Sequence, residues 1–222
     1  MRDFPTLFSM AAKRKGGDAA LEKLISKPKS KAALEKLGDD RWLSGMARAV
    51  YRAGFNWKVV ENKWPEIEEA FRQFNPLVVS HMSDEDLDEL LKDPRVIRNW
   101  RKIKAIRTNA QYIMELAEEH GSAALFFARH PSDDYISLIA GLSKNGAFLG
   151  GTTAQYFLRE MGKDSFILSR DVIAALKREK VFDGTPTSKR SLAAIQEAFN
   201  HWVDDGGKSL TRVSRVLSMS VG

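Results

Sequence analysis

Cysteine is absent from the 222 residues of this chain, and the four histidines stand apart from one another. Without cysteine the chain can form neither a disulfide nor a zinc or iron–sulfur site with thiolate ligands, and its composition suits a reducing compartment. His81, His120, His130 and His201 include no pair at i,i+4 spacing and no spacing typical of metal ligands. We therefore expect no bound metal and no other cofactor.

Long apolar runs are also missing. No stretch approaches the ~18 apolar residues of a membrane-spanning helix. Near the N-terminus, Lys13, Arg14 and Lys15 interrupt the sequence before the apolar core of a signal peptide could form. We therefore expect a soluble, monomeric protein of a bacterial-type cytosol or nucleoid, without membrane contact.

Strand-like alternation of apolar and polar residues is absent over any useful length, whereas helical periodicity recurs. The sequence therefore predicts an all-α fold with short connections. Pro65 is expected at the first turn of a helix, where proline is favourable. Ser83 and Asp86 have the spacing of a capping box. Further helices are predicted over residues 41–53, 100–120, 136–142, 152–161, 171–180, 192–202 and 210–219.

The charge balance is basic. The chain has 35 lysines and arginines against 29 acidic residues, a net charge of +6 and a pI of about 9.5. Such a balance favours polyanionic partners such as nucleic acid, although many basic proteins bind none. Five cations crowd the start of one predicted helix, where they are either phosphate contacts or a solvated face: Arg98, Arg101, Lys102, Lys104 and Arg107.

A glycine-rich stretch, GAFLGGTTAQYFL at residues 146–158, connects two predicted helices. Glycine permits positive φ and close approach of another backbone, and a threonine can cap the helix that follows. The first amides of that helix carry the positive end of its dipole, which suits a phosphate. The alternative is a tight helix–helix turn without a ligand. The residues predicted to bind phosphate here are Gly146, Gly150, Gly151, Thr152 and Thr153.

Several ordered motifs surround this stretch. GFNW occupies residues 54–57, FRQFNP residues 71–76, and IRNWRKIKAIRTNA residues 97–110. Together with GGTT at residues 150–153, they resemble the 3-methyladenine DNA glycosylase I family of the helix-hairpin-helix DNA glycosylase superfamily. The resemblance covers roughly residues 40–175. It implies a two-lobed all-α fold with the base pocket between the lobes. It also implies hydrolysis of the N-glycosidic bond of an alkylated, cationic purine such as 3-methyladenine, flipped out of damaged double-stranded DNA.

The resemblance also suggests how the chain is divided. We expect one glycosylase-like unit over residues 1–222. Its parts are a helical N-terminal extension over roughly residues 1–38, a family-like core over 39–180 with the hairpin at 146–153, and C-terminal helices over 181–222.

An aromatic pocket is implied around one tryptophan. Trp57 matches the family's pocket tryptophan, which would stack on the extruded base and gain of order 1 kcal/mol from its positive charge. Trp42, Tyr51, Phe55 and Asn56 are close to it in the sequence and are expected to complete the pocket. The alternative for the aromatic ones is core packing.

Two features of the family pattern, a carboxylate and a zinc site, are missing from their expected places. The family's base-contacting glutamate falls on Ala49, so that carboxylate is missing or has moved to another residue such as Asp39, Asp40 or Glu61. The family's zinc site, which uses cysteine, has no counterpart either. The base specificity is therefore the least constrained part of the resemblance.

The catalytic aspartate of the wider superfamily falls on Ser169, and the nearest carboxylate is that of Asp171. We take these two as the catalytic candidates. The 3-methyladenine family itself lacks this aspartate. A cationic purine departs as a neutral base and needs no proton, so such an enzyme mainly binds, orients and admits water.

Two other functions stay open at this point. One is a catalytically silent or repurposed DNA-binding protein of the same fold, which Ala49 and Ser169 favour. The other is a helical protein–protein module that binds no DNA, whose duplex binding would be absent or insensitive to salt.

Overall fold

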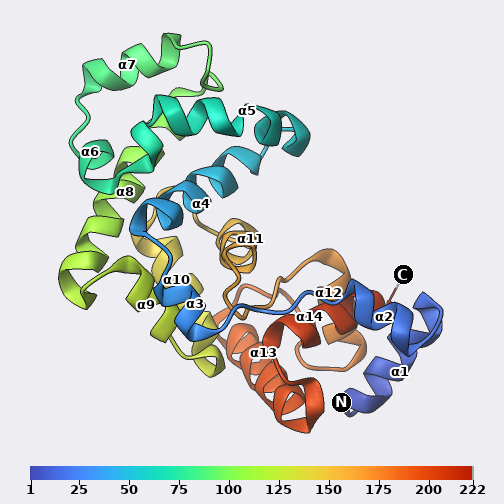
Figure 1. Ribbon diagram of the computed structural model, residues 1–222. Helices are drawn as coiled ribbons and strands as arrows, with labels where there is room; N and C mark the ends of the chain where they lie inside the picture. The colour runs from blue at the N-terminus through green and yellow to red at the C-terminus, as the bar shows by residue number, and fades with distance from the viewer. Residues whose placement is uncertain (222) are drawn as a thin grey trace. The chain divides into compact units, whose positions relative to one another are not determined.

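The chain is helical, and the described residues, 1–221, contain no strand in the computed structural model (Figure 1). The all-α prediction is therefore confirmed. The helices are α1 (Phe4–Lys15), α2 (Asp18–Leu24), α3 (Lys31–Glu35), α4 (Asp39–Arg52), α5 (Trp57–Ala70), α6 (Pro76–Ser80), α7 (Asp84–Lys92), α8 (Trp100–His120), α9 (Ala123–Arg129), α10 (Tyr135–Asn145), α11 (Thr152–Met161), α12 (Arg170–Arg178), α13 (Lys189–Trp202) and α14 (Leu210–Met219).

Local capping explains where several of these helices begin and end. Ser83 and Asp86 form the predicted capping box at the start of α7, each side chain accepting the other residue's backbone N–H. The long helix α8 begins after Asn99, whose side chain accepts the N–H of Lys102. It ends at Gly121, whose φ of 86° lies in the left-handed region that favours glycine.

The expectation for Pro65 was wrong. Helix α5 begins eight residues earlier, at Trp57, and Pro65 lies inside it. Asn56 starts the helix by accepting the backbone N–H of Lys58 at 2.9 Å. A favourable N-cap upstream thus outweighs the preference of proline for a first turn, at the cost of one backbone hydrogen bond inside the helix.

The contacts divide the chain into two compact units. One, unit A, contains residues 30–129 and 139–161, and the other, unit B, contains residues 1–29, 130–138 and 162–222. Each unit combines segments that are far apart in the sequence. The boundaries near residues 38 and 180, which were expected from the family resemblance, stay a prediction.

Helix α4 forms the centre of unit A, where it packs against α5, α8 and α11 (Figure 1). The Trp42 ring is fully buried and stacks on Phe127, with ring centroids 4.4 Å apart. Phe157 from α11 meets the same indole edge-on at 5.9 Å. Burying aromatic side chains of this size contributes a few kcal/mol each, so this cluster fixes α11 against α4.

Unit B joins the N-terminal helices to the C-terminal ones. Helix α14 packs against α1, α12 and α13. The Trp202 indole N–H donates to the carbonyl of Arg2 at 2.9 Å. Asp164 lies in the extended segment before α12 and accepts the backbone N–H groups of Leu210 and Thr211 at 3.0 and 2.8 Å. The N-terminal residues are therefore an integral part of this unit's packing.

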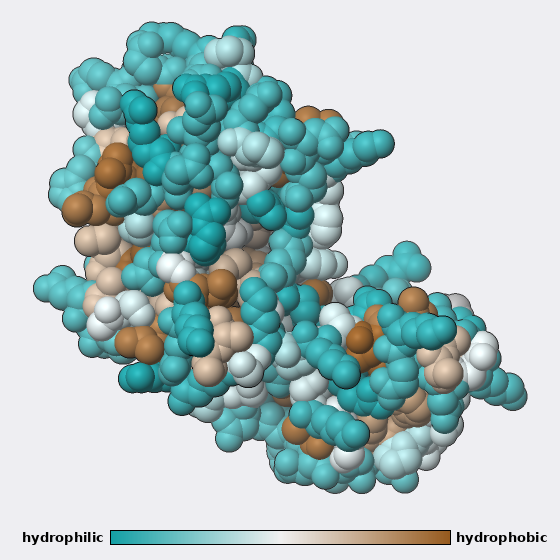
Figure 2. Space-filling model, viewed as in Figure 1, coloured by the Kyte–Doolittle hydropathy of each residue, from teal (hydrophilic) through white to brown (hydrophobic). Residues whose placement is uncertain are grey.

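The surface is mainly hydrophilic. On the face shown in Figure 2, apolar residues gather only in small separate patches. No helix within residues 1–221 combines the length and apolar character needed to cross a membrane. The large exposed apolar side chains include two aromatic ones, Trp57 and Phe148, which belong to the predicted pocket and hairpin. Aromatic side chains are enriched at interfaces relative to the rest of a protein surface.

Candidate functional site

A pocket of about 140 Å³ lies in unit A, where α4 and the start of α5 meet one face of the hairpin helix α11, from its first turn to its last. It is smaller than the roughly 300–1,000 Å³ of pockets for drug-sized ligands, which suits one small planar group. Its lining residues are Ala49, Arg52, Ala53, Trp57, Thr152, Thr153, Tyr156 and Glu160.

Trp57 supplies the exposed aromatic surface of this pocket. Its side chain is 47% exposed, because it is the first residue of α5 and projects from the helix end. The Tyr156 ring meets it edge-on at 5.6 Å, and the guanidinium carbon of Arg52 lies 5.0 Å from the centroid of the indole. The indole is thus held in place and already interacts with a planar cation.

The cation over Trp57 is tied to two carboxylates. Arg52 donates from Nε and Nη2 to Glu61 Oε1 at 2.9 and 2.5 Å, and its Nη1 pairs with Glu160 Oε1. Burial raises the pKa of Glu160 above its ordinary value; the charge of Arg52 opposes this shift and that of Glu61 adds to it. Neither Arg52 nor Glu160 belongs to the site expected from the sequence. Their ion pair joins α4 to α11, a helix that lies about 100 residues later in the sequence.

The position of the missing family glutamate faces the same pocket. Ala49 lines it, and no carboxylate is present there. The three alternatives named above lie outside the lining. Asp39 accepts the backbone N–H of Ala124 at 3.0 Å, and Asp40 pairs with Arg41. Glu61 pairs with Arg52 but does not line the pocket, so the carboxylate within the lining is that of Glu160.

The hairpin that precedes α11 is fastened by one residue of α8. Asn109 is fully buried; its Oδ1 accepts the N–H of Ala147 at 2.7 Å and its Nδ2 donates to the carbonyl of Ala147 at 3.1 Å. The Leu149 side chain is buried beneath the turn. A side-chain amide that satisfies both backbone groups of one residue fixes a turn firmly, because a buried polar group without a partner is costly. Asn109 lies within the run at residues 97–110 and is not among the residues expected at the site from the sequence.

Backbone conformation explains the glycines in this turn. Gly151 has a φ of 56°, and a side chain there would have open space but a strained backbone. At Gly146 the obstacle is space, since a Cβ would lie 2.8 Å from the carbonyl oxygen of Leu142. Thr152 and Thr153 follow at the N-terminus of α11 and line the pocket. The hairpin and the pocket therefore adjoin each other, and phosphate binding by the hairpin stays a prediction.

Two aromatic residues predicted for the pocket belong to the core instead. Trp42 and Tyr51 are fully buried, and neither lines the pocket. Burial raises the pKa of the Tyr51 phenol above its ordinary value. Phe55 lies under a lysine ammonium group, 4.4 Å from its ring centroid, and Asn56 is the N-cap of α5. None of these four residues lines the pocket, and Asn56 caps the helix that begins with Trp57.

Lys102 is not a surface cation, contrary to the phosphate contact predicted for it. It is 7% exposed, and its Nζ donates to the carbonyls of Val50 at 2.8 Å, Tyr51 at 3.1 Å and Ala53. Burial lowers its pKa. Its ammonium group instead binds carbonyl groups at the C-terminal end of α4, where the helix dipole favours a cation.

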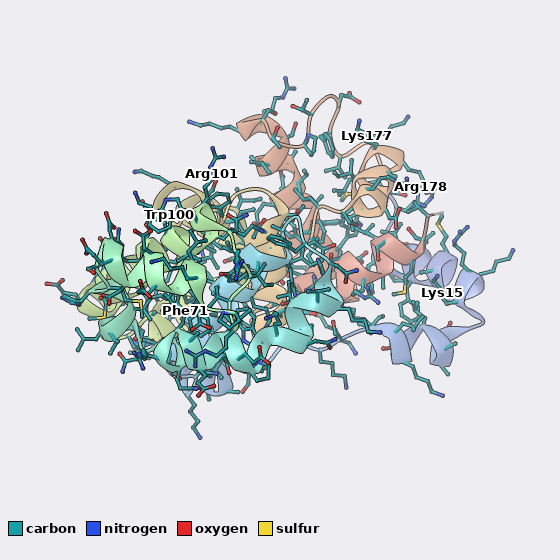
Figure 3. The ribbon with its side chains drawn as sticks, turned by 90° about the horizontal axis from the view of Figure 1, so that it is seen from above. Lys15, Phe71, Trp100, Arg101, Lys177 and Arg178 are labelled. Atoms are coloured by element: carbon teal, nitrogen blue, oxygen red, sulfur yellow. The ribbon has the colours of Figure 1, made fainter. Side chains whose placement is uncertain are left out.

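Other cations of this helix do face solvent. Arg98 is exposed before α8. Arg101 is exposed in the first turn and points away from the ribbon in Figure 3. These two remain available to a phosphate, and their contact with DNA stays a prediction.

The catalytic candidates lie in unit B. Ser169 is the N-cap of α12, and its Oγ accepts the N–H of Val172 at 3.3 Å. Asp171 is half-exposed in the first turn of the same helix, with one oxygen 4.0 Å from Arg170. Both residues have local roles at a helix start, and a catalytic role for either stays a prediction.

Comparisons with known sequences agree on one family. The family model described as methyladenine glycosylase matches residues 36–138. The DNA-3-methyladenine glycosylase of Haemophilus influenzae is 32% identical over 130 residues, which cover 50% of this chain and 70% of that protein. The DNA-3-methyladenine glycosylase 1 of Escherichia coli is 34% identical over 76 residues, 34% of this chain and 40% of that protein. The chain thus spans less than half of one relative and more than two thirds of the other.

Solved structures show the same fold. A mutant of 3-methyladenine DNA glycosylase I from Staphylococcus aureus has a TM-score of 0.52 at 25% identity, over 63% of this chain and 81% of that one. The Methanocaldococcus jannaschii 8-oxoguanine glycosylase/lyase, crystallised with DNA containing 8-oxoguanine, has a TM-score of 0.53 at 17% identity, over 96% of this chain and 95% of that one. The likeness to the second structure concerns the fold alone and extends through nearly the whole chain.

Proposed function

Because the chain belongs to the methyladenine glycosylase family, we propose that it hydrolyses the N-glycosidic bond of alkylated, cationic purines such as 3-methyladenine in duplex DNA. The observation that carries this proposal is the half-exposed Trp57 at a pocket that also contains the hairpin threonines. An extruded base would stack on the indole while the hairpin binds the neighbouring backbone.

The side chains around the pocket suit a reaction that needs little acid–base help. A purine alkylated on a ring nitrogen already carries positive charge, so it leaves as a neutral base without taking a proton. The main tasks of the protein are then to hold the base on Trp57, keep the sugar in place and admit water. Stacking and cation–π attraction are worth about 1–3 kcal/mol per base, enough to retain an extruded cation.

The supporting experiment is base release from methylated duplex DNA, followed by chromatography of the freed bases. The wild-type chain is expected to release 3-methyladenine in proportion to enzyme and time, and undamaged adenine not at all. The control is the same chain heated until it unfolds. Release no faster than from this control would reject hydrolysis of alkylated purines.

The hairpin yields a second prediction, on DNA affinity. Gly151→Ala is expected to weaken binding to a duplex containing an abasic site about fivefold, because alanine at a φ of 56° is strained by roughly 1–2 kcal/mol and the turn relaxes. Fluorescence anisotropy with a labelled duplex measures this affinity.

The matched control is Gly141→Ala in α10, where a Cβ meets no atom within 4 Å and φ is helical. Alanine is a better helix former than glycine, so this variant should bind as the wild type does. Equal affinities for the two variants would show that the turn does not contact the phosphates.

A catalytically silent DNA-binding protein of the same fold is the second candidate function. It is favoured by Ala49 and by the capping role of Ser169. Tight, salt-dependent binding to abasic duplex without any base release would support it over the glycosylase. Partners beyond damaged duplex DNA are not needed by either proposal. The monomeric state, the cytosolic location and a pocket between the lobes stay predictions.

A further inference from the structure

The lining of the pocket contains one carboxylate, that of Glu160, and its ion pair is with a residue of another helix. Glu160 lies in the last turn of α11, and its side chain is 32% exposed. Its partner is the guanidinium of Arg52, which comes from α4. A carboxylate in a largely apolar pocket loses hydration, so it favours a partner that supplies both charge and N–H donors.

Arg52 meets this requirement with the same chemistry that an alkylated adenine would bring. A guanidinium is planar, positively charged and rich in N–H donors. In this structure it lies over Trp57 and pairs with Glu160 at the same time. An alkylated adenine is likewise a planar cation, and its exocyclic amino group donates hydrogen bonds. The group now over Trp57 therefore imitates the substrate that the pocket is proposed to bind.

We propose that Glu160 is the specificity-determining carboxylate of this pocket. Arg52 pairs with Glu160 and covers Trp57 while no base is bound, and an alkylated adenine replaces Arg52 at both contacts when it binds. The proposal deepens the proposed function and rests on it for the identity of the substrate. The carboxylate that contacts the base then belongs to α11. On α4, the position of the family's base-contacting glutamate is occupied by Ala49, which has no carboxylate.

The distinction that Glu160 makes is between adenine and guanine. Adenine has an exocyclic amino group that donates, whereas guanine has an exocyclic oxygen that accepts at the same position. A carboxylate only accepts, so it attracts the amino group and repels the oxygen. Glu160 should therefore favour alkylated adenine over alkylated guanine, although both can stack on Trp57.

Three charged groups face Glu160 and set its ionisation. Arg52 and Arg48 come from α4, and Glu61 comes from α5. Burial raises the pKa of Glu160, Arg52 and Arg48 oppose the shift, and Glu61 adds to it. The ionised form is the one that binds the amino group, so affinity should be full above this raised pKa and decline as the pH falls through it. With Glu160→Gln this acid-side decline should vanish.

The test uses isothermal titration calorimetry of the full chain with two free bases, 3-methyladenine and 7-methylguanine. The wild type is expected to prefer 3-methyladenine. Glu160→Gln should weaken 3-methyladenine about tenfold, because a charged acceptor is lost. It should leave 7-methylguanine unchanged or tighter, since the glutamine amide can donate to the guanine oxygen.

Glu61→Gln is the matched control. Glu61 pairs with the same Arg52 but does not line the pocket, so this variant should change the preference between the two bases less than twofold. Thermal melting of all three proteins excludes a difference in folding.

Each outcome decides the proposal. It is overturned if Glu160→Gln keeps the wild-type affinities, if Glu61→Gln causes the same loss, or if the wild type binds neither base. Base release from methylated DNA is scored separately. A wild type that binds 3-methyladenine through Glu160 and releases none would uphold this inference and reject the hydrolysis.

Discussion

Replacing Trp57 with alanine is expected to lower the rate of 3-methyladenine release about 100-fold. The indole is the exposed aromatic face of the pocket, and stacking with a cationic base contributes about 1–3 kcal/mol, where 1.4 kcal/mol is a factor of ten. The measurement is kcat/KM for base release from methylated duplex DNA. Because the base is held by this face when the bond breaks, the loss should appear in kcat as well as in KM.

Trp57→Phe is the companion variant. Phenylalanine keeps an aromatic face but has a smaller and less electron-rich ring, so most of the activity should return, with a remaining loss of a few-fold. Stability should hardly change in either variant, since 47% of the Trp57 side chain is exposed. An alanine variant as active as the wild type would remove Trp57 from the site and, with it, the pocket proposed here.

How far the sequence could predict the site depends on how local each feature is. The hairpin glycines and Trp57 could be found because their motifs are continuous in the chain and their conformations are set by neighbouring residues. Glu160 could not, since its importance arises from a contact between α11 and α4 that sequence spacing does not reveal. Asn109 is a similar case, because its partner Ala147 lies on the hairpin.

For two sets of residues, the sequence alone could have decided between the alternatives left open. Lys102 precedes Ile106, Asn109 and Ile113 at spacings of four, three and four, which place all of them on one helix face, and that face is buried. The charge of Lys102 suggested solvent, but its position in the period indicated the interior.

The aromatic residues of α4 provide the second case. Trp42, Met46 and Val50 recur at a spacing of four and are all fully buried, so closeness to Trp57 in the sequence was a weaker guide than helical period. Side chains on one helix share a face only at such spacings, and Trp42 is on the core face, whereas Ala49 and Arg52 reach the pocket.

Lys102→Met is expected to lower the free energy of unfolding by about 3 kcal/mol and the melting temperature by roughly 6–12 °C. Methionine keeps the length of the side chain but leaves the carbonyls of Val50, Tyr51 and Ala53 without the ammonium group that now donates to them. Circular dichroism during heating and urea unfolding measure both quantities. Activity should fall too, because these carbonyls end the helix that carries Arg52 and lead directly to Trp57.

Lys104→Met separates this effect from a mere loss of charge. Lys104 lies two residues further along α8 and is exposed, so its replacement should change the stability by less than about 0.5 kcal/mol. Equal stability of the two variants would mean that water replaces the ammonium group at the end of α4 without cost. The expected difference in stability between the two variants would show that buried Lys102 stabilises the segment that precedes Trp57. A cation that the sequence assigned to the DNA surface would then support the pocket from inside the protein.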